Sequence, residues 1–422
     1  MSSKRKDSKG RVLRNGESQR ADGRYMFRYT DAWGERQTVY SWKLVETDKI
    51  PEGKKCDKPL REIEKQIQQD IGDGIKTKDA SNITVEDMFW SFINDRRDLK
   101  ETSRCNYICL YNNHIKEKLG GRRIGAVKHS DIQRYYIDLL GEQGYSYNTA
   151  QLIQAILCQL FDIAVMDNII RTNPTNKALQ KAKRITNAEP KKRHALTEDE
   201  QARFIDFVYG SAVYKKWGNL FTVLLGTGLR IGEALGLRWQ DCDFNNNTIY
   251  VNHTLLYAPK AATMQYEYRI STPKTMSGVR VVPMFNDVKN ALIKEREMQK
   301  QRSSKFAVDG YTDFIFLNRN GRVYTPASIF GTIQRITNAY NAMELSMAIQ
   351  EGRQPKPLPQ FSPHNLRHTF CTRLCENEQN IKIIQDIMGH SNIATTMDVY
   401  SEATMSKKQA SFQSIEGKMK LV

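Results

Sequence analysis

The sequence predicts a multidomain α+β fold: a small β-sheet-plus-helix domain, a four-helix domain, and a mostly helical domain with a small antiparallel sheet. Three observations lead to this prediction. Near the N-terminus, apolar and polar side chains alternate with the period of a β-strand. Residues 84–170 then repeat apolar side chains at helical spacing. The strand period returns only within residues 248–284, between further helical patterns, so strands and helices occupy separate stretches of the chain.

The length and net charge of the chain indicate what kind of partner it binds. The chain has 422 residues, enough for two or three domains, and a formal net charge of +17. This charge indicates a polyanionic partner, most simply nucleic acid, with an anionic membrane surface as the alternative. We expect no membrane span, because a span needs ~20 consecutive apolar residues and we identify no such stretch. We also expect no secretion signal, because the N-terminus lacks an apolar core. The seven cysteines lack CxxC spacing and are typical of reduced thiols in a cytoplasmic protein.

Residues 1–78 form the first predicted domain. Tyr25, Phe27 and Tyr29 alternate with polar neighbours, and a second alternating run follows a short turn, which predicts a β-hairpin. A helix from Pro59 onward has an apolar stripe that would cover one face of this sheet.

The other face of the predicted sheet would be basic. A sheet is one of the elements that can enter the major groove of DNA. The candidate DNA-binding residues are Arg20, Arg24, Arg28 and Arg36. The alternative interpretation is a solvated basic tail beside a purely structural hairpin.

Residues 82–176 form the second predicted domain. Thr84 and Asp87 have the spacing of a helix capping box. Three more helical patterns follow, over residues 104–115, 130–140 and 148–170. Together they predict a small four-helix domain. The charged, proline-containing segment 177–195 is predicted to be a basic linker.

Residues 196–422 form the third predicted domain, which opens with a capping box at Thr197 and Glu200. An apolar helical stretch leads into three strand patterns joined by two turns, which predict a small antiparallel sheet. The strand patterns cover residues 248–257, 266–274 and 278–284.

The stretch from Ser362 to Tyr400 gathers reactive side chains. Ser362 and Pro363 indicate a helix start, and His364 and Arg367 are three residues apart, so they lie together on that helix. A second helix is predicted from residue 380 to a glycine stop at residue 389. His390 follows the stop, and a short helical run then carries Tyr400.

Five segments in this order resemble the catalytic domain of the tyrosine recombinases, also called the phage integrase family. They are TGLRIGEALGLRW, TPKTMSGVRVVPM, SPHNLRHTFCT, IMGHSN and TTMDVYSEAT. Over its whole length the chain resembles the integrases of Tn916-type conjugative transposons. The resemblance implies the tyrosine recombinase fold, with an arm-type DNA-binding domain, a helical core-binding (SAM-like) domain, and a catalytic domain with a C-terminal tail. It also implies a bacterial, DNA-associated enzyme that integrates and excises a mobile element.

Cutting a DNA strand requires a nucleophile, positive charge on the nonbridging oxygens, and a proton for the leaving 5′ oxygen. Tyr400 resembles the family's nucleophile, whose attack gives a 3′-phosphotyrosyl link that stores the bond without ATP. Arg230 and Arg367 resemble the arginine pair that holds the scissile phosphate. Lys274, at a hairpin tip, resembles the lysine that protonates the leaving oxygen.

The remaining site residues have supporting roles in this resemblance. His364 would assist proton transfer at the tyrosine, and His390 would hydrogen-bond the phosphate. Glu233 resembles the acidic residue that orients Arg230. No metal and no cofactor are expected, because the cations supply the charge. The implied partners are double-stranded DNA at core and arm sites, a homo-tetramer on that DNA, and an excisionase or DNA-bending accessory protein.

Each assignment has a structural alternative. An arginine on a helix is more often a surface charge, and a tyrosine such as Tyr400 is more often an amphipathic anchor. Lys274 taken alone would be a solvated loop residue. The spacing of His364, His368 and Cys371 suggests zinc, but no further ligand completes a site. Acidic side chains at 241 and 243 are better interpreted as turn formers than as ligands of a two-metal site.

Two rival functions share these sequence features. A type IB topoisomerase uses a similar tyrosine and arginine set, although the extra N-terminal unit argues against it. A non-catalytic DNA-binding regulator would have the same basic charge and helices. Both rivals predict DNA binding, and they differ in whether strands are cut and exchanged.

Overall fold

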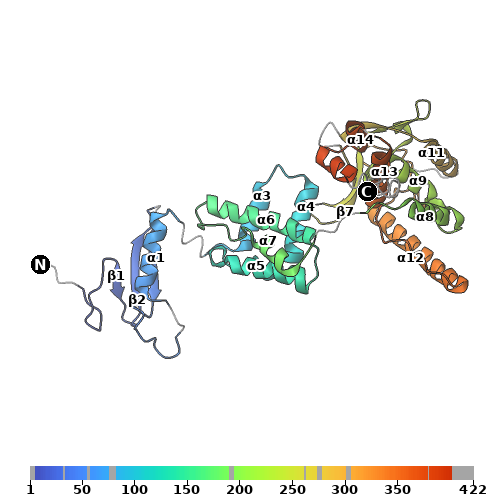
Figure 1. The fold of residues 1–422 in the computed structure, drawn as a ribbon. Helices are drawn as coiled ribbons and strands as arrows, with labels where there is room; N and C mark the ends of the chain where they lie inside the picture. The colour runs from blue at the N-terminus through green and yellow to red at the C-terminus, as the bar shows by residue number, and fades with distance from the viewer. Residues whose placement is uncertain are drawn as a thin grey trace, which may run out of the picture. The chain divides into compact units, whose positions relative to one another are not determined.

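The computed structural model describes residues 5–31, 34–54, 58–75, 82–189, 194–260, 263–272, 278–300, 306–378 and 380–401. The chain divides into two compact units, residues 1–191 and 192–422 (Figure 1).

The N-terminal part of the first unit is a three-stranded antiparallel sheet with one helix. Its elements are β1 (Glu17–Gln19), β2 (Tyr25–Thr30), β3 (Arg36–Ser41) and α1 (Leu60–Gly72). Tyr25 and Phe27 point from β2 into a core with Leu60 and Ile67 of α1. The predicted hairpin and covering helix are therefore confirmed, and β1 adds a strand that was not expected. Residues 32 and 33 of the predicted turn lie outside the described residues.

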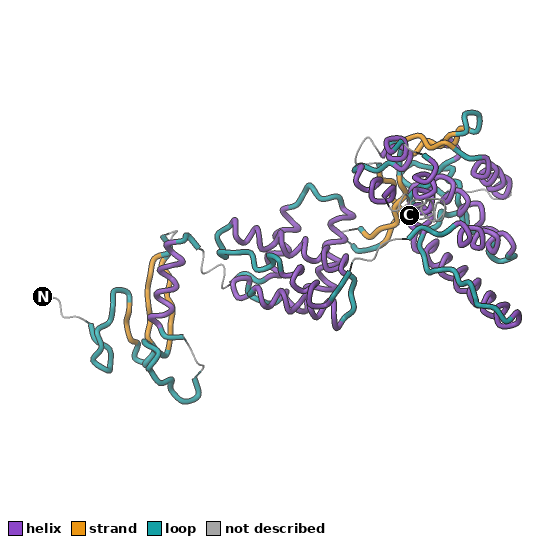
Figure 2. Tube along the Cα trace, in the orientation of Figure 1, coloured by secondary structure: helices purple, strands orange, loops and turns teal. Residues whose placement is uncertain are grey.

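A helical body follows in the same unit. Its elements are α3 (Val85–Asp95), α4 (Glu101–Leu110), η1 (Tyr111–Gly120), η2 (Ile124–Ala126), α5 (His129–Ile137), η3 (Asp138–Glu142), α6 (Tyr147–Met166) and α7 (Ala178–Thr186). The capping box at the start of α3 is confirmed, since Thr84 and Asp87 bond reciprocally. Helices dominate this body in Figure 2.

The segment predicted as a linker, residues 177–195, differs from the expectation. Its first half is α7, whose Ala178, Leu179 and Ala182 are buried in the core of the helical body. Apolar residues at i, i+1 and i+4 give this highly charged segment a narrow buried stripe. The lysines and arginines around the stripe concealed it in the sequence. The helical body thus has a further helix beyond the four predicted.

Helix α6 corrects the expectation that no stretch approaches the length and apolar content of a membrane span. It is the one helix, among the described residues, that is long enough and apolar enough to cross a membrane, judged by length and composition alone. Its buried residues form the centre of the helical body's core, with Ile153, Leu157 and Leu160 fully inaccessible to solvent. A central core helix reaches the same apolar content because other helices surround it.

The second unit is mostly helical. Its helices are α8 (Glu198–Gly210), η4 (Lys215–Trp217), α9 (Gly218–Thr227), α10 (Ile231–Gly236), η5 (Trp239–Asp241), α11 (Asn286–Gln299), α12 (Pro326–Glu351), α13 (Pro363–Asn377) and α14 (Ile381–Met388). Residues 393–401 form a further helix. Helix α9 is almost entirely buried and packs against α11 and α13. The predicted capping box of Thr197 and Glu200 is confirmed.

The strands of this unit form two small antiparallel sheets instead of the single one expected. They are β4 (Cys242–Asp243), β5 (Thr248–Val251), β6 (Thr254–Pro259), β7 (Tyr266–Ser271) and β8 (Arg280–Pro283). One sheet has the order β4-β5-β8, and the other pairs β6 with β7.

The predicted strand 248–257 breaks at its centre because His253 turns into the protein. This side chain is 4% exposed, and its Nε2 lies 2.7 Å from the carbonyl oxygen of Gly236 in α10. Helix α10 also lies directly against β6: a Cβ atom on Gly232 would stand 2.7 Å from the carbonyl oxygen of Leu255. The histidine and the glycine together direct β6 away from the β5 sheet and onto α10.

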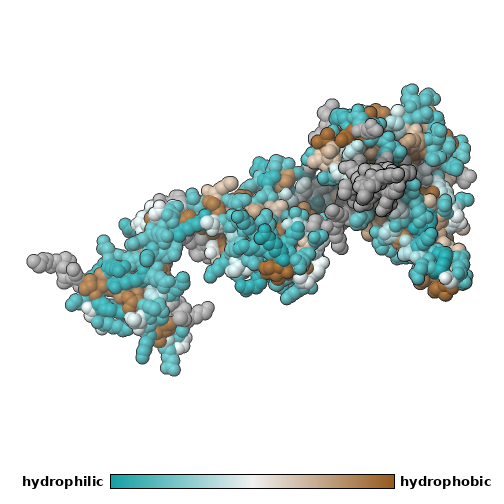
Figure 3. Space-filling model, viewed as in Figure 1, coloured by the Kyte–Doolittle hydropathy of each residue, from teal (hydrophilic) through white to brown (hydrophobic). Residues whose placement is uncertain are grey.

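Most of the molecular face seen in Figure 3 is hydrophilic. The C-terminal end of the long helix α12 is an exception, because Leu345 is 51% and Ile349 72% exposed. This end projects from the second unit in Figure 1.

Candidate active site

Arg230 lies in the sharp connection between α9 and α10. Gly228 ends α9 with a φ of +62°, and a Cβ atom there would stand only 2.4 Å from Cδ1 of Phe370. Glycine therefore satisfies both the backbone conformation and the close packing. Two residues later, Arg230 caps α10: its backbone N–H donates to Oε2 of Glu233 at 2.9 Å, and its Nη1 donates to Oε1 at 2.7 Å. The predicted pairing of Arg230 with Glu233 is present.

Arg367 comes from the buried side of α13. The side chain is almost fully enclosed, with 3% of the residue exposed. Its Nη1 donates to the carbonyl oxygen of Gly228 at 2.6 Å, and its Nη2 donates to that of Met388 at 2.5 Å. One guanidinium thus ties together the end of α9 and the end of α14, so its position depends on three helices.

The C-terminal end of α14 is the point where these groups meet. Gly389 adopts a φ of +62° and ends the helix, as predicted. The last three carbonyl oxygens of this end each accept a hydrogen bond from a different arginine: Ile387 from Nε of Arg280 at 2.8 Å, Met388 from Arg367, and Gly389 from Nη2 of Arg230 at 3.0 Å. These carbonyls lack partners within the helix and carry its negative dipole end, so cations are favoured there.

Arg280 was not predicted from the sequence. It begins β8, is 7% exposed, and donates from Nη1 and Nη2 to the two oxygens of Glu233 at 3.2 and 2.8 Å. A signal was available in the strand pattern, because Arg280 and Val282 alternate with outward neighbours and so face the interior. A charged residue at an inward strand position requires a buried partner of opposite charge.

Charge pairing dominates the electrostatics of this cluster. Burial alone would raise the pKa of Glu233, but the hydrogen bonds and charges of Arg280, together with the charge of Arg230, lower it to about 2. Burial and the neighbouring cation Arg230 lower the pKa of Arg367 to about 9, which leaves its guanidinium charged at neutral pH. The cluster therefore presents net positive charge.

His390 follows directly after the end of α14. Its Nδ1 lies 2.9 Å from Oγ1 of Thr396, in the helix that carries Tyr400. Burial, and then the charges of Arg367 and Arg230, lower the pKa of His390 to about 4. The imidazole is therefore neutral at pH 7, which suits a hydrogen-bond donor or acceptor better than a fixed cation.

This lowered pKa predicts that the free energy of unfolding falls in mild acid. Between pH 6.5 and 4 the unfolded chain binds a proton at residue 390 that the folded chain excludes, so stability decreases as the pH falls. We expect this contribution to be on the order of 1 kcal/mol between pH 7.5 and 5, allowing for partial exposure. Denaturant unfolding of the wild-type and His390→Gln proteins at both pH values measures it. Equal pH dependence in the two proteins would contradict the prediction.

Tyr400 lies in the predicted C-terminal helical run, which residues 393–401 confirm as a helix. The ring packs against a small apolar cluster that includes Phe370 of α13, Met388 of α14 and Val399. The nucleophile candidate thus shares a core with the helices that hold Arg367 and the arginine-bound carbonyls. His364 is exposed on the first turn of α13, and its charge is among those that lower the pKa of His390.

The structure brings together five predicted site residues, Arg230, Glu233, Arg367, His390 and Tyr400, and adds Arg280 to them. Lys274 lies outside the described residues, as does the whole C-terminal tail, residues 403–422. Within the parts of the chain that the structure describes, no group of three or more His, Cys, Asp or Glu side chains is arranged to hold a metal ion.

The four candidate DNA-binding arginines gather on one face of the N-terminal sheet. In the antiparallel register, Arg28 lies opposite Thr38 and Thr30 opposite Arg36, so these pairs share the face turned away from the buried Tyr25 and Phe27. The guanidinium groups of Arg20 and Arg24 each stack 5.5 Å from the ring centre of Tyr40. This face therefore combines exposed cations with aromatic surface.

Other basic residues of this region are engaged within the protein. Arg11 forms ion pairs with Asp7 and Asp48 at 2.8 and 2.9 Å, and Lys9 also pairs with Asp48. Their charges are therefore partly neutralised. On the sheet face, Arg20 and Arg24 likewise pair with Asp22, at 3.5 and 2.8 Å.

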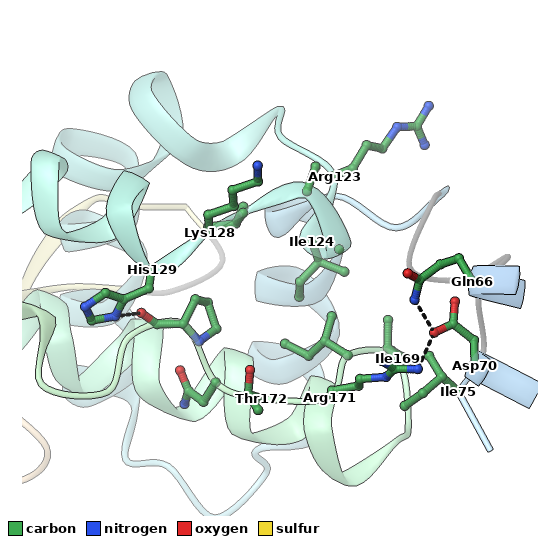
Figure 4. Close-up of a pocket in the computed structure, with 16 residues that line it drawn as sticks. Gln66, Asp70, Ile75, Arg123, Ile124, Lys128, His129, Ile169, Arg171 and Thr172 are labelled. Atoms are coloured by element: carbon green, nitrogen blue, oxygen red, sulfur yellow. Dashed lines mark hydrogen bonds and ion pairs between the residues drawn. The ribbon is translucent and has the colours of Figure 1, made fainter. Parts of the chain in front are cut away.

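A pocket of about 750 Å³ lies in the first unit, between α1 and the helical body (Figure 4). Arg171 spans it and forms ion pairs with Asp70 at 2.6 Å and Asp73 at 2.8 Å. Its guanidinium is thus neutralised by two carboxylates, which is the geometry of a structural junction. The predicted site residues do not line this pocket.

Known proteins similar to this chain belong to the family that the motifs of the site resemble. Residues 194–407 match the model of the phage integrase family, residues 84–140 match the N-terminal SAM-like domain of phage integrases, and residues 1–71 match the DNA-binding domain of the Tn916 integrase. The transposase from transposon Tn916 of Enterococcus faecalis is 36% identical over 97% of this chain and 96% of its own length. The transposase from transposon Tn1545 of Streptococcus pneumoniae gives the same values.

A solved structure extends this likeness to three dimensions. The integrase of transposon Tn1549 in complex with transposon right end DNA is 33% identical, with a TM-score of 0.66 over 79% of this chain and 100% of that chain. Identity at this level over nearly the full length, joined to the arginine, histidine and tyrosine geometry, establishes the family. This chain belongs to the phage integrase family, that is, to the tyrosine recombinases, and is of the Tn916 type.

Proposed function

We propose that this chain is a site-specific recombinase that cuts and rejoins DNA through a 3′-phosphotyrosyl intermediate, and that it thereby integrates and excises a mobile element. The observation that carries the proposal is the meeting of Arg230, Arg367 and His390 at the end of α14, with Tyr400 held in the adjoining helix. Two guanidiniums and a neutral imidazole match the needs of a phosphodiester at its transition state.

In the proposed reaction, the phenol oxygen of Tyr400 attacks phosphorus and the 5′ oxygen departs. Arg230 and Arg367 stabilise charge on the nonbridging oxygens, and His390 hydrogen-bonds one of them. His364, near His390, accepts the phenol proton. Lys274 donates a proton to the departing 5′ oxygen, a role that rests on the sequence motif alone. In the reverse step, the 5′ hydroxyl of another strand attacks the phosphotyrosine and releases Tyr400.

We also propose that this chemistry uses neither a metal ion nor ATP. The cationic groups supply the charge that a metal supplies in other phosphoryl-transfer sites. The phosphotyrosyl link replaces one phosphodiester bond by another, so rejoining needs no further source of free energy.

The domains would divide the recognition of DNA between them. Residues 1–78 would read arm-type sites through the sheet face that carries Arg20, Arg24, Arg28 and Arg36. Residues 82–176 would bind the core site, and residues 196–422 would catalyse cleavage. The described basic side chains and the family matches support this division.

The proposed assembly is a homo-tetramer on double-stranded DNA. It would act in the bacterial cytoplasm and would not bind a membrane. An excisionase or DNA-bending accessory protein would set the direction of the reaction. Support comes from a solved lambda integrase tetramer on a Holliday junction, which shares this fold at 17% identity and a TM-score of 0.50.

The test uses two linear DNAs that each carry the element's own recombination site, together with a supercoiled plasmid. We expect recombinant products that join the two DNAs, formed in the presence of a metal chelator and without ATP. Relaxation of the plasmid without joined products would favour a topoisomerase. Binding to the sites without any cleavage would favour a DNA-binding regulator.

A further inference from the structure

Resting on the proposed function, we infer that Arg280 is a positioning residue of this site: it holds Glu233 and the end of α14 in the arrangement that aims Arg230 at the scissile phosphate. Arg280 would act through these groups and would not itself touch DNA.

The contacts of Arg280 account for this role. Its Nη1 and Nη2 close on the two oxygens of Glu233, and its Nε donates to the carbonyl oxygen of Ile387. The side chain is 5% exposed. A guanidinium whose two terminal nitrogens face a buried carboxylate and whose Nε faces a helix end is directed into the protein, away from solvent.

Glu233 is fixed because two arginines share it. Oε1 accepts from Nη1 of Arg230 and Nη1 of Arg280, and Oε2 accepts from the backbone N–H of Arg230 and Nη2 of Arg280. Arg230 therefore gives the carboxylate only one of its two terminal nitrogens, and its Nη2 reaches the carbonyl oxygen of Gly389. Without Arg280, the buried carboxylate would bind both terminal nitrogens of Arg230. The guanidinium of Arg230 would then rotate away from the phosphate.

Arg280 also sets the end of α14 itself. A Cβ atom on Gly389 would stand 3.0 Å from both Cδ and Nη1 of Arg280, so the arginine packs directly against this glycine turn. The same turn presents the carbonyl oxygen for Arg230 and leads into His390. Strand β8 is thereby connected to two members of the site through one side chain.

The test compares two suicide DNA substrates, one with the natural scissile phosphate and one with a neutral methylphosphonate at that position. The measured quantity is the ratio of the two rates of covalent adduct formation. An arginine aimed at a nonbridging oxygen favours the charged substrate, so the ratio reports on that alignment. Loss of folded protein lowers both rates equally and cancels in the ratio.

Three variants decide the question. Arg280→Met keeps most of the side-chain volume, and Arg230→Met removes the clamp itself. Arg238→Met is the matched control, because Arg238 makes a similar two-point pair with the buried Asp241, through Nε at 3.1 Å and Nη2 at 3.0 Å, and donates to none of the three carbonyls at the α14 end.

We expect Arg280→Met to lower the phosphate rate by about 100-fold, the scale of a misplacement near 1 Å, and to reduce the rate ratio to that of Arg230→Met. Arg238→Met should keep the wild-type ratio. If Arg280→Met keeps the wild-type ratio while Arg230→Met reduces it, Arg280 has only a structural role and the inference is overturned. Absence of any adduct from the wild-type protein would overturn the proposed function, and the inference with it.

Discussion

Arg367→Lys is expected to slow covalent adduct formation on a suicide substrate by about 10²- to 10³-fold, the usual effect of removing one preorganised donor from a site of developing negative charge. Lysine retains the charge, but one ammonium cannot span the carbonyl oxygens of Gly228 and Met388 that the two terminal nitrogens of Arg367 join. The remaining cation would be displaced from the phosphate. Binding to the same DNA should change far less, because many other basic groups contribute to affinity.

Arg373→Lys provides the control for this variant. Arg373 lies on the same helix and also donates to a backbone carbonyl, that of Leu196 at 2.9 Å, while its Nη1 pairs with Glu376. Its replacement should affect the free energy of unfolding without slowing the adduct. Equal losses of activity in the two variants would indicate that α13 tolerates no arginine replacement, and would contradict a specific role for Arg367.

Tyr400→Phe is expected to abolish adduct formation, because it removes the attacking oxygen and leaves no other route to a 3′-linked protein. The ring is retained, and with it the packing against the apolar cluster that includes Phe370, Met388 and Val399, so the melting temperature should stay close to that of the wild type. Gel separation of protein linked to a labelled suicide substrate measures the loss. DNA binding by the same protein should persist.

Tyr250→Phe is the matched change elsewhere in the second unit. Tyr250 is on β5, is 46% exposed and lies outside the five motifs of the site. It should form the adduct at the wild-type rate. An adduct with the Tyr400→Phe protein would contradict the assignment of the nucleophile.

Local patterns predicted much of this molecule. The capping boxes at Thr84 and Thr197 are confirmed, and so is the helix from Asn380 to the glycine stop at Gly389. These features depend on residues within one or two helical turns, where spacing determines which side chains meet. The sheet and helix at the N-terminus are confirmed for the same reason, since alternation along β2 fixes which side chains face α1.

Long-range pairing explains what the sequence did not predict. Arg280 meets Glu233 across 47 positions of sequence and Ile387 across 107, and no local periodicity encodes either contact. The division of the strands into two sheets depends on His253 reaching Gly236, again a contact between separate elements. The lysines and arginines of α7 concealed the short apolar stripe that buries this helix.

For the site residues, too, the sequence predicted identities and the fold determined contacts. The contacts of Arg230, Arg367 and His390 at the end of α14 belong to the folded domain, whereas their candidacy came from motifs. The catalytic role of Lys274 stays a prediction from the sequence motif alone. The order of those motifs identified the members of the site, and the fold supplied the arginine that links them.

In the proposed reaction, Tyr400 becomes covalently attached to DNA. Trapping the wild-type protein on a suicide substrate, digesting the complex with trypsin and locating the attached nucleotide by mass spectrometry tests it directly. We predict a nucleotide joined through its 3′ phosphate to the peptide of residues 383–407, on Tyr400. Attachment to any other residue, or through a 5′ phosphate, would contradict the account.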